Sequence, residues 1–87
     1  MTAQRDRVNR APAEPVLLHR IDPAQNMRRF YALSIEPTLF GEFAIVTRWG
    51  RVGSPRGQMR SQSFGSAEDA AAAMQRQTQV KLRRGYR

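Results

Sequence analysis

The residues best suited to chemistry in this sequence are arginines gathered around its single tryptophan, in the run Arg48-Trp49-Gly50-Arg51. Guanidinium groups beside an aromatic ring at a chain corner suit contact with a phosphate backbone and with a neighbouring sugar or base. The candidate nucleic-acid-binding residues are therefore Trp49, Gly50, Arg51, Arg48, Arg56 and Arg60. The competing interpretation is a tryptophan packed in the core, with the arginines forming a solvated rim.

The overall charge agrees with a polyanionic partner. The 87 residues include 15 basic and 7 acidic side chains, which gives a net charge of +8. Such an excess usually accompanies nucleic-acid binding and sometimes binding to a membrane surface. Every basic residue except Lys81 is an arginine, which favours bidentate phosphate contacts. A GC-rich coding sequence explains the arginine preference equally well, but it does not explain the positive excess.

Residues for catalysis and metal binding are scarce. The sequence has no cysteine and one histidine, His19, so disulfides, thiol nucleophiles and the usual zinc sites are excluded. No carboxylate pair, catalytic serine set or phosphate-binding P-loop is present. We therefore expect a binding module without enzymatic activity, cofactor, metal or small-molecule substrate. Because no apolar run approaches the roughly 18 residues of a membrane span, we also expect a cytoplasmic protein that does not bind membranes.

Four stretches with the pattern of strands precede one helix. Residues 16–21 form a short apolar run, residues 27–36 and 42–50 alternate between apolar and polar side chains, and residues 58–64 form a polar stretch. Alternation of this kind predicts half-buried strands. The residue types at positions 54–57, Ser-Pro-Arg-Gly, predict a hairpin between the last two strands that is closed by a type I turn.

The same alternation assigns faces within the strands. In residues 42–50 it places Trp49 with Phe43 and Ile45, which favours burial of the indole. Gly50 follows directly, and a glycine inside a strand often marks a bulge or the close approach of another backbone. Either feature would re-aim the tryptophan, so the sequence leaves a buried and an exposed orientation open.

A helix near the C-terminus completes the predicted fold. Ser66 is a favoured N-cap residue, and Glu68 and Asp69 place negative charge in the first turn. Gly85 fits the position just beyond the last turn. The expected fold class is therefore α+β, a small antiparallel β-sheet of three to four or more strands packed by one C-terminal α-helix.

The first 15 residues differ from the rest of the sequence. They lack hydrophobic periodicity and combine charged residues with Pro12 and Pro15. This composition predicts a disordered N-terminal arm at residues 1–15, which leaves residues 16–87 as the folded domain.

The tryptophan motif and the order of the elements resemble the WGR domain family. The resemblance is carried by Arg48-Trp49-Gly50-Arg51-Val52-Gly53, followed by Gly57-Gln58, Phe64, the helix, Lys81 and Gly85-Tyr86. Upstream, Ile21-Asp22-Pro23, Asn26 and Arg29-Phe30-Tyr31 resemble small bacterial stand-alone members. The resemblance covers residues 16–87 and implies the family fold, an antiparallel sheet with one helix.

The family resemblance also implies a partner. WGR domains occur in DNA-dependent poly(ADP-ribose) polymerases and in bacterial proteins that resemble a molybdate metabolism regulator. In the polymerases the domain helps to bind broken DNA ends, and the motif tryptophan meets the DNA backbone. The resemblance thus favours DNA over RNA as the partner of Trp49, with support from Gly50, and the residues themselves leave both polymers open. In the polymerases the motif arginine, here Arg51, relays the bound state to neighbouring domains, and this sequence contains no polymerase domain to receive it.

Two functions remain open from the sequence. The first is a non-catalytic module that binds the DNA backbone or strand ends. The second is a protein-interaction or homodimerisation module whose basic charge is incidental. Amide chemical shifts recorded while a short duplex is added would separate the two.

Overall fold

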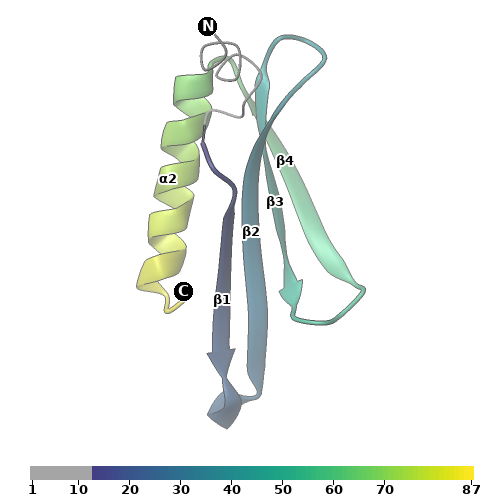
Figure 1. The fold of residues 1–87 in the computed structure, drawn as a ribbon, viewed down its shortest axis with the longest axis vertical. Coiled ribbons are helices and arrows are strands. Elements are labelled where there is room, and N and C mark those ends of the chain that lie inside the picture. Colours follow the sequence, from purple (N-terminus) through teal and green to yellow (C-terminus); the bar gives the residue numbers. More distant parts are fainter. Residues whose placement is uncertain (1–12) are drawn as a thin grey trace, which may run out of the picture.

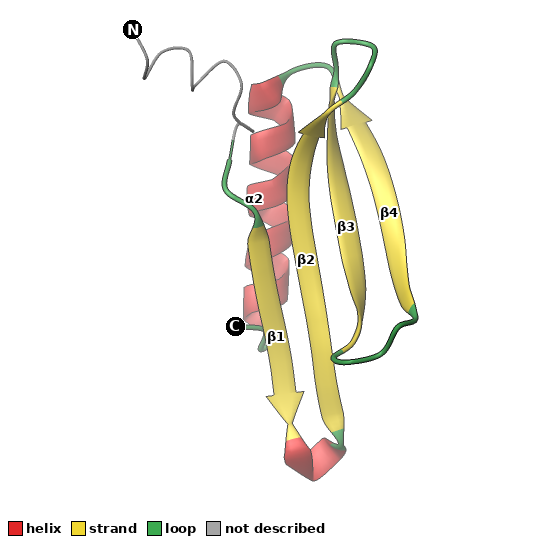
Figure 2. Ribbon diagram, turned by 45° about the vertical axis from the view of Figure 1, so that its right-hand side comes forward, coloured by secondary structure: helices red, strands yellow, loops and turns green. Residues whose placement is uncertain are grey.

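The computed structural model describes residues 13–87 as a four-stranded sheet with one long helix against one side (Figure 1). The elements are β1 (Val16–Asp22), the 3-10 helix η1 (Pro23–Gln25), β2 (Met27–Pro37), β3 (Phe43–Arg51), β4 (Gly57–Phe64) and α2 (Ala67–Arg83). Neighbouring strands are antiparallel and follow chain order, β1-β2-β3-β4. The predicted α+β class is confirmed (Figure 2). The predicted arm, residues 1–15, lies largely outside the described residues.

The core lies between α2 and the sheet face that the alternation predicts to be buried. Leu33, Ile35 and Ile45 are almost fully buried there, and Ala70 and Met74 pack on them from the helix. Because the side chains of α2 at this contact are mostly small, the helix lies close to the larger aliphatic residues of the strands. Within residues 13–87, no helix packs on the opposite face of the sheet, which we call the open face.

The N-terminus of α2 is capped as the sequence predicts. The backbone N–H of Asp69 donates to the hydroxyl of Ser66 at 3.1 Å, and Glu68 and Asp69 stand in the first turn. The first N–H groups of a helix have no partner inside the helix, so a cap of this kind contributes about 1 kcal/mol.

The C-terminus of α2 also ends as predicted, in a Schellman motif. Gly85 adopts a φ of +95°, its N–H donates to the carbonyl of Leu82, and the N–H of Tyr86 donates to the carbonyl of Lys81, both at 3.1 Å. The reversal buries Tyr86 edge-on against Tyr31, with ring centroids 6.2 Å apart. This packing fixes the end of the helix over the sheet.

The connection between β3 and β4 differs from the prediction. The sequence predicts a type I turn at residues 54–57, but the backbone hydrogen bond closes residues 51–54, where the N–H of Ser54 donates to the carbonyl of Arg51 at 3.1 Å. Gly53, with a φ of +81°, accounts for the shift, because only glycine readily takes a positive φ at the third position of a tight turn. The Ser54 hydroxyl then accepts the N–H of Arg56 at 3.1 Å and orders the rest of the loop.

Candidate nucleic-acid interface

A shallow cleft of about 250 Å³ opens where the C-terminal end of α2 meets the sheet, and Tyr31, Trp49, Arg60 and Lys81 line it. We call it the Trp49 cleft. Tyr31 and Trp49 are direct neighbours across β2 and β3, with ring centroids 6.5 Å apart and ring planes at 36°. Arg60 reaches the cleft from β4, and Lys81 reaches it from the last turn of α2. Two aromatic rings and two cations therefore share one opening.

The indole of Trp49 is half-buried, between the two orientations that the sequence leaves open. One part packs against the core, as its shared face with Ile45 predicts, and another part lines the cleft. Such a ring is held by the fold and still accessible to a ligand, which is the arrangement that a stacking contact requires.

Lys81 lies over the rings of Tyr31 and Tyr86, and other positively charged side chains are nearby. Its Nζ is 4.5 Å from the centroid of the Tyr31 ring and 5.3 Å from that of Tyr86. Partial burial, followed by the positive charges of Arg84 and Arg29, holds the pKa of Lys81 below its ordinary value. A bound anion would offset this repulsion and would raise the pKa of Lys81 again.

Gly50 makes a close backbone approach and no bulge. The register runs through it without interruption, with Phe30 opposite on β2 and Gly57 opposite on β4. A methyl group at Gly50 would lie 3.3 Å from Cα of Gly57, 3.4 Å from the carbonyl oxygen of Arg56 and 3.4 Å from Cε1 of Phe30. A side chain at the glycine of the tryptophan motif would therefore fit only if its neighbours moved by a few tenths of an ångström.

The predicted arginines do not all gather at the tryptophan. Arg60 lines the Trp49 cleft. Arg48 belongs to the open face, because successive residues of a strand point to opposite sides of the sheet, and its cross-strand neighbours there are Ala32 and Met59. Arg56 is exposed in the loop after β3. The structure thus divides the predicted group between two faces.

Arg51 holds the end of β3 to the connection between β1 and β2. Its guanidinium donates to the backbone carbonyl of Asn26 at 3.2 Å and to Oδ1 of the same residue at 3.3 Å. Asn26 is the one non-glycine residue with positive φ among residues 13–87, at 52°. The second arginine of the motif therefore ties the end of β3 to a turn whose left-handed residue, Asn26, is of a type that adopts this conformation more readily than most.

Two residues of the cleft, Tyr31 and Lys81, are absent from the predicted set. Alternation does give the face of Tyr31, since it shares a side with Leu33 in residues 27–36. What the sequence does not show is the register that sets Tyr31 beside Trp49, or the packing that brings Lys81 over the Tyr31 ring.

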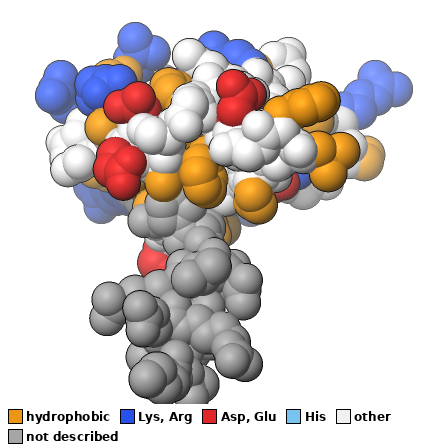
Figure 3. Space-filling view, turned by 90° about the horizontal axis from the view of Figure 1, so that it is seen from above, with side chains coloured by type: hydrophobic (Ala, Val, Ile, Leu, Met, Phe, Trp, Pro, Cys, Tyr) orange, Lys and Arg blue, Asp and Glu red, His pale blue; other side chains and the backbone are white. Residues whose placement is uncertain are grey.

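Charge is distributed unevenly along the molecule, whose principal dimensions are 51 × 22 × 22 Å. Glu36 and Glu42 flank the β2–β3 loop, and Glu68 and Asp69 begin α2 at the same end. Figure 3 views this end from above and shows acidic side chains beside apolar ones. Toward the opposite end lie the cleft, the cations Arg29, Arg51, Arg56, Lys81 and Arg84, and the carboxylate of Asp22.

Residues 13–87 offer neither a metal site nor a membrane span. No three or more histidine, aspartate or glutamate side chains in this part of the chain are placed to hold a metal ion. None of the helices found there is long and apolar enough to cross a bilayer.

A small basic α+β domain, with a tryptophan cleft between its sheet and the end of its helix, has the build of a binding domain. The chain belongs to the WGR domain family, whose model matches residues 14–87. This family is associated with nucleic-acid binding in proteins like the poly(ADP-ribose) polymerases.

A bacterial relative carries the same domain within a longer chain. Uncharacterized protein y4dW of Sinorhizobium fredii is 46% identical over 70 residues, which cover 80% of this chain and 34% of that protein. The chain therefore spans about a third of the relative's length. No solved structure matches the sequence significantly.

Proposed function

We propose that this domain is a non-catalytic DNA-binding module that contacts the backbone and terminal nucleotide of a DNA end through the Trp49 cleft. The observation that carries the proposal is the half-buried indole of Trp49, which lines an opening together with the cations of Arg60 and Lys81. The absence of cysteine and the basic charge suit such a role in the cytoplasm.

The proposed contact follows from the chemistry of the lining residues. A sugar or terminal base stacked on the exposed part of Trp49 would gain about 1–3 kcal/mol. Arg60 from β4 and Lys81 from α2 line the same cleft as the ring, so the phosphate that follows that nucleotide would meet a cation there. A DNA end suits a shallow cleft better than the middle of a duplex, because only an end offers the unstacked face of a base.

The test compares two labelled duplexes of equal length by fluorescence anisotropy, one with blunt ends and one closed by hairpin loops. We expect tighter binding to the open duplex, and a slope of log K against log salt of about −3 to −5 if three to six phosphates are contacted. Trp49→Leu keeps an apolar side chain but removes the stacking surface, so it is expected to weaken end binding by about 1–3 kcal/mol. Arg60→Ala should weaken it and make the salt slope shallower by about 1.

Arg76→Ala is the matched control, because it removes one positive charge from an exposed position in the middle of α2, away from the cleft. Equal losses for Arg60→Ala and Arg76→Ala would show that the domain responds to net charge alone. Equal affinity for the open and the closed duplex would remove the end preference from the proposal.

A protein-interaction role is the second candidate, and the β2–β3 loop favours it. Leu39 and Phe40 are 99% and 87% exposed there. The loop is nevertheless ordered, since the Thr38 hydroxyl accepts the N–H groups of Phe40 and Glu42, each at 3.2 Å. Exposed apolar side chains on an ordered loop are typical of a protein contact. Sedimentation velocity tests the homodimer form, in which Phe40→Ser would convert a dimer into a monomer without changing DNA affinity.

A further inference from the structure

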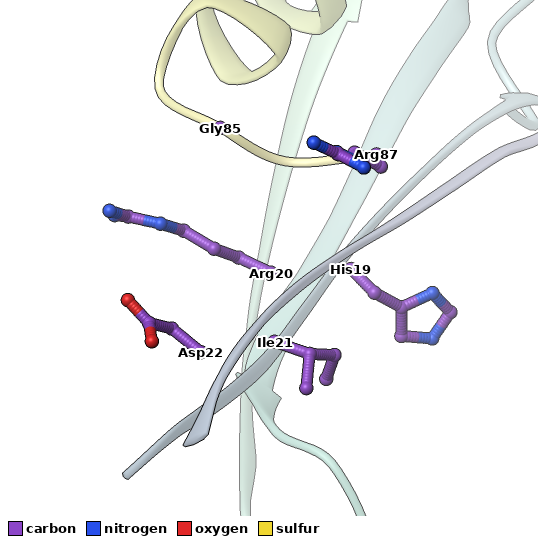
Figure 4. A pocket seen from close by; sticks show the side chains of 6 residues that line it. All are labelled: His19, Arg20, Ile21, Asp22, Gly85 and Arg87. Carbon is purple, nitrogen blue, oxygen red and sulfur yellow. The ribbon is translucent and has the colours of Figure 1, made fainter. Parts of the chain in front are cut away.

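The open face has its own aromatic and basic surface at the same end of the sheet as the Trp49 cleft. Figure 4 shows that His19 and Ile21 leave β1 on the side opposite to Arg20 and Asp22. Arg20 packs near Gly85 at the end of α2, so His19 and Ile21 belong to the open face. The register then places Phe30 beside His19 on this face.

The phenyl ring of Phe30 lies over the backbone of two glycines, Gly50 and Gly57. In its row across the sheet, Gly50 and Gly57 are the next two residues, so no side chain from β3 or β4 rises beside the phenyl ring. Ring atoms lie 3.4 and 3.8 Å from the positions that Cβ atoms would occupy at these two glycines. The ring is therefore laid against the sheet and remains only half-buried.

Two exposed arginines flank this ring along the strand direction. Arg28 stands two residues before Phe30 on β2, and Arg48 lies on β3 opposite Ala32, two residues after it. At ~3.3 Å per residue, the two rows are about 13 Å apart with the ring between them. The nearby carboxylate of Asp22 points to the other side of the sheet (Figure 4). The surface therefore combines a stacking platform with two cations.

We propose that the open face binds single-stranded nucleic acid without sequence preference, with a base stacked on Phe30 and the adjoining phosphates on Arg28 and Arg48. Stacking on an aromatic ring tolerates every base, and arginines at the flanks follow the backbone. This proposal rests on the proposed function only in assuming that the domain binds nucleic acid. The two sites are otherwise independent, because this surface and the Trp49 cleft lie on opposite faces of the sheet. A DNA end with an unpaired overhang could thus place its duplex at the cleft and its single strand on the open face.

The experiment measures the affinity of the whole chain for fluorescent (dT)12, (rU)12 and a blunt duplex. Phe30→Leu keeps an apolar side chain over the glycines and removes the ring, so we expect (dT)12 affinity to fall about 5- to 100-fold. The double variant Arg28→Ala/Arg48→Ala changes two exposed positions, and we expect its salt slope to be shallower by about 1.4. Arg76→Ala serves again as the charge-matched control and should bind (dT)12 nearly as the unchanged protein does.

The ratio of single-strand to duplex affinity distinguishes the two sites. Phe30→Leu and Arg28→Ala/Arg48→Ala should lower (dT)12 affinity more than blunt-duplex affinity, and Arg60→Ala should do the reverse. Loss of (dT)12 binding in Arg60→Ala with full binding in Arg28→Ala/Arg48→Ala would overturn the proposal, as would no (dT)12 binding at low salt. Failure of the blunt duplex to bind, with (dT)12 binding intact, would instead refute the Trp49 cleft. Comparison of (dT)12 with (rU)12 identifies the sugar.

Discussion

Substitution of the motif glycine, Gly50→Ala, tests how the sheet is packed. The added methyl group would lie 3.3 Å from Cα of Gly57 and 3.4 Å from both the Arg56 carbonyl oxygen and Cε1 of Phe30. Favourable carbon contacts begin near 3.5 Å, and two of these three neighbours are backbone atoms that cannot rotate away. Overpacking of this kind costs roughly 1–3 kcal/mol, and we take about 2 kcal/mol as the central value.

That free energy corresponds to a fall in melting temperature of roughly 8–16 °C for a domain of this size. Thermal unfolding followed by circular dichroism measures it. Gly65→Ala is the matched control, because a methyl group there meets no atom within 4 Å and its φ lies outside the positive range. We expect Gly65→Ala to change stability by no more than about 0.5 kcal/mol.

The same variant separates a packing role for Gly50 from a ligand-contact role. The Cβ position at Gly50 points to the open face, whereas Trp49 faces the cleft on the other side. Below its melting temperature, folded Gly50→Ala should therefore keep its affinity for a blunt duplex. An unchanged melting temperature combined with lost duplex binding would refute the packing argument and show that the glycine makes room for DNA.

Three further outcomes are expected. Arg51→Ala should lower the free energy of unfolding by about 0.5–1.5 kcal/mol in chemical denaturation, since it removes two hydrogen bonds to Asn26, and Arg51→Lys should not restore it fully because an ammonium cannot span both acceptors. NMR titration should find the pKa of Lys81 below the ordinary lysine value, and bound DNA should raise it again. Because the pKa of Lys81 is lower in the folded than in the unfolded state, the unfolded state binds more protons between these two pKa values. The contribution of Lys81 to stability should therefore increase as the pH rises through that range. Limited proteolysis should remove residues 1–15 and leave residues 16–87 intact, and a protected N-terminus would contradict the predicted domain boundary.

Local patterns predict the fold well because they are read one element at a time. The period of two in residues 27–36 correctly marks Leu33 and Ile35 as core residues, and Ser66 and Gly85 correctly mark the ends of the helix region. The turn before β4 lies at residues 51–54 and not at residues 54–57, because both adjacent segments have residue types that favour a turn. The positive φ of Gly53 selects the first of them.

The site was harder to predict because it depends on contacts between distant elements. Trp49 and Arg60 could be found as an aromatic and a cation of one hairpin, but Lys81 enters the cleft from the end of α2. Arg48 is the converse case: it is adjacent to Trp49 in the chain but lies on the opposite face of the sheet. Sequence distance is therefore a poor measure of which side chains share a face.

Among residues 13–87, most carboxylates lie at one end of the 51 Å axis and most cations lie toward the other, which gives this part of the chain an electric dipole. In the field of a polyanion, a dipole experiences a torque that turns its positive end forward before any contact is made. For a domain that binds DNA through that end, Glu36, Glu42 and Glu68 would raise the share of correctly oriented encounters, although they lower the net charge. Acidic residues far from the interface can thus favour the productive orientation, and their replacement by lysine would make the protein more basic but its approach to DNA less selective in orientation.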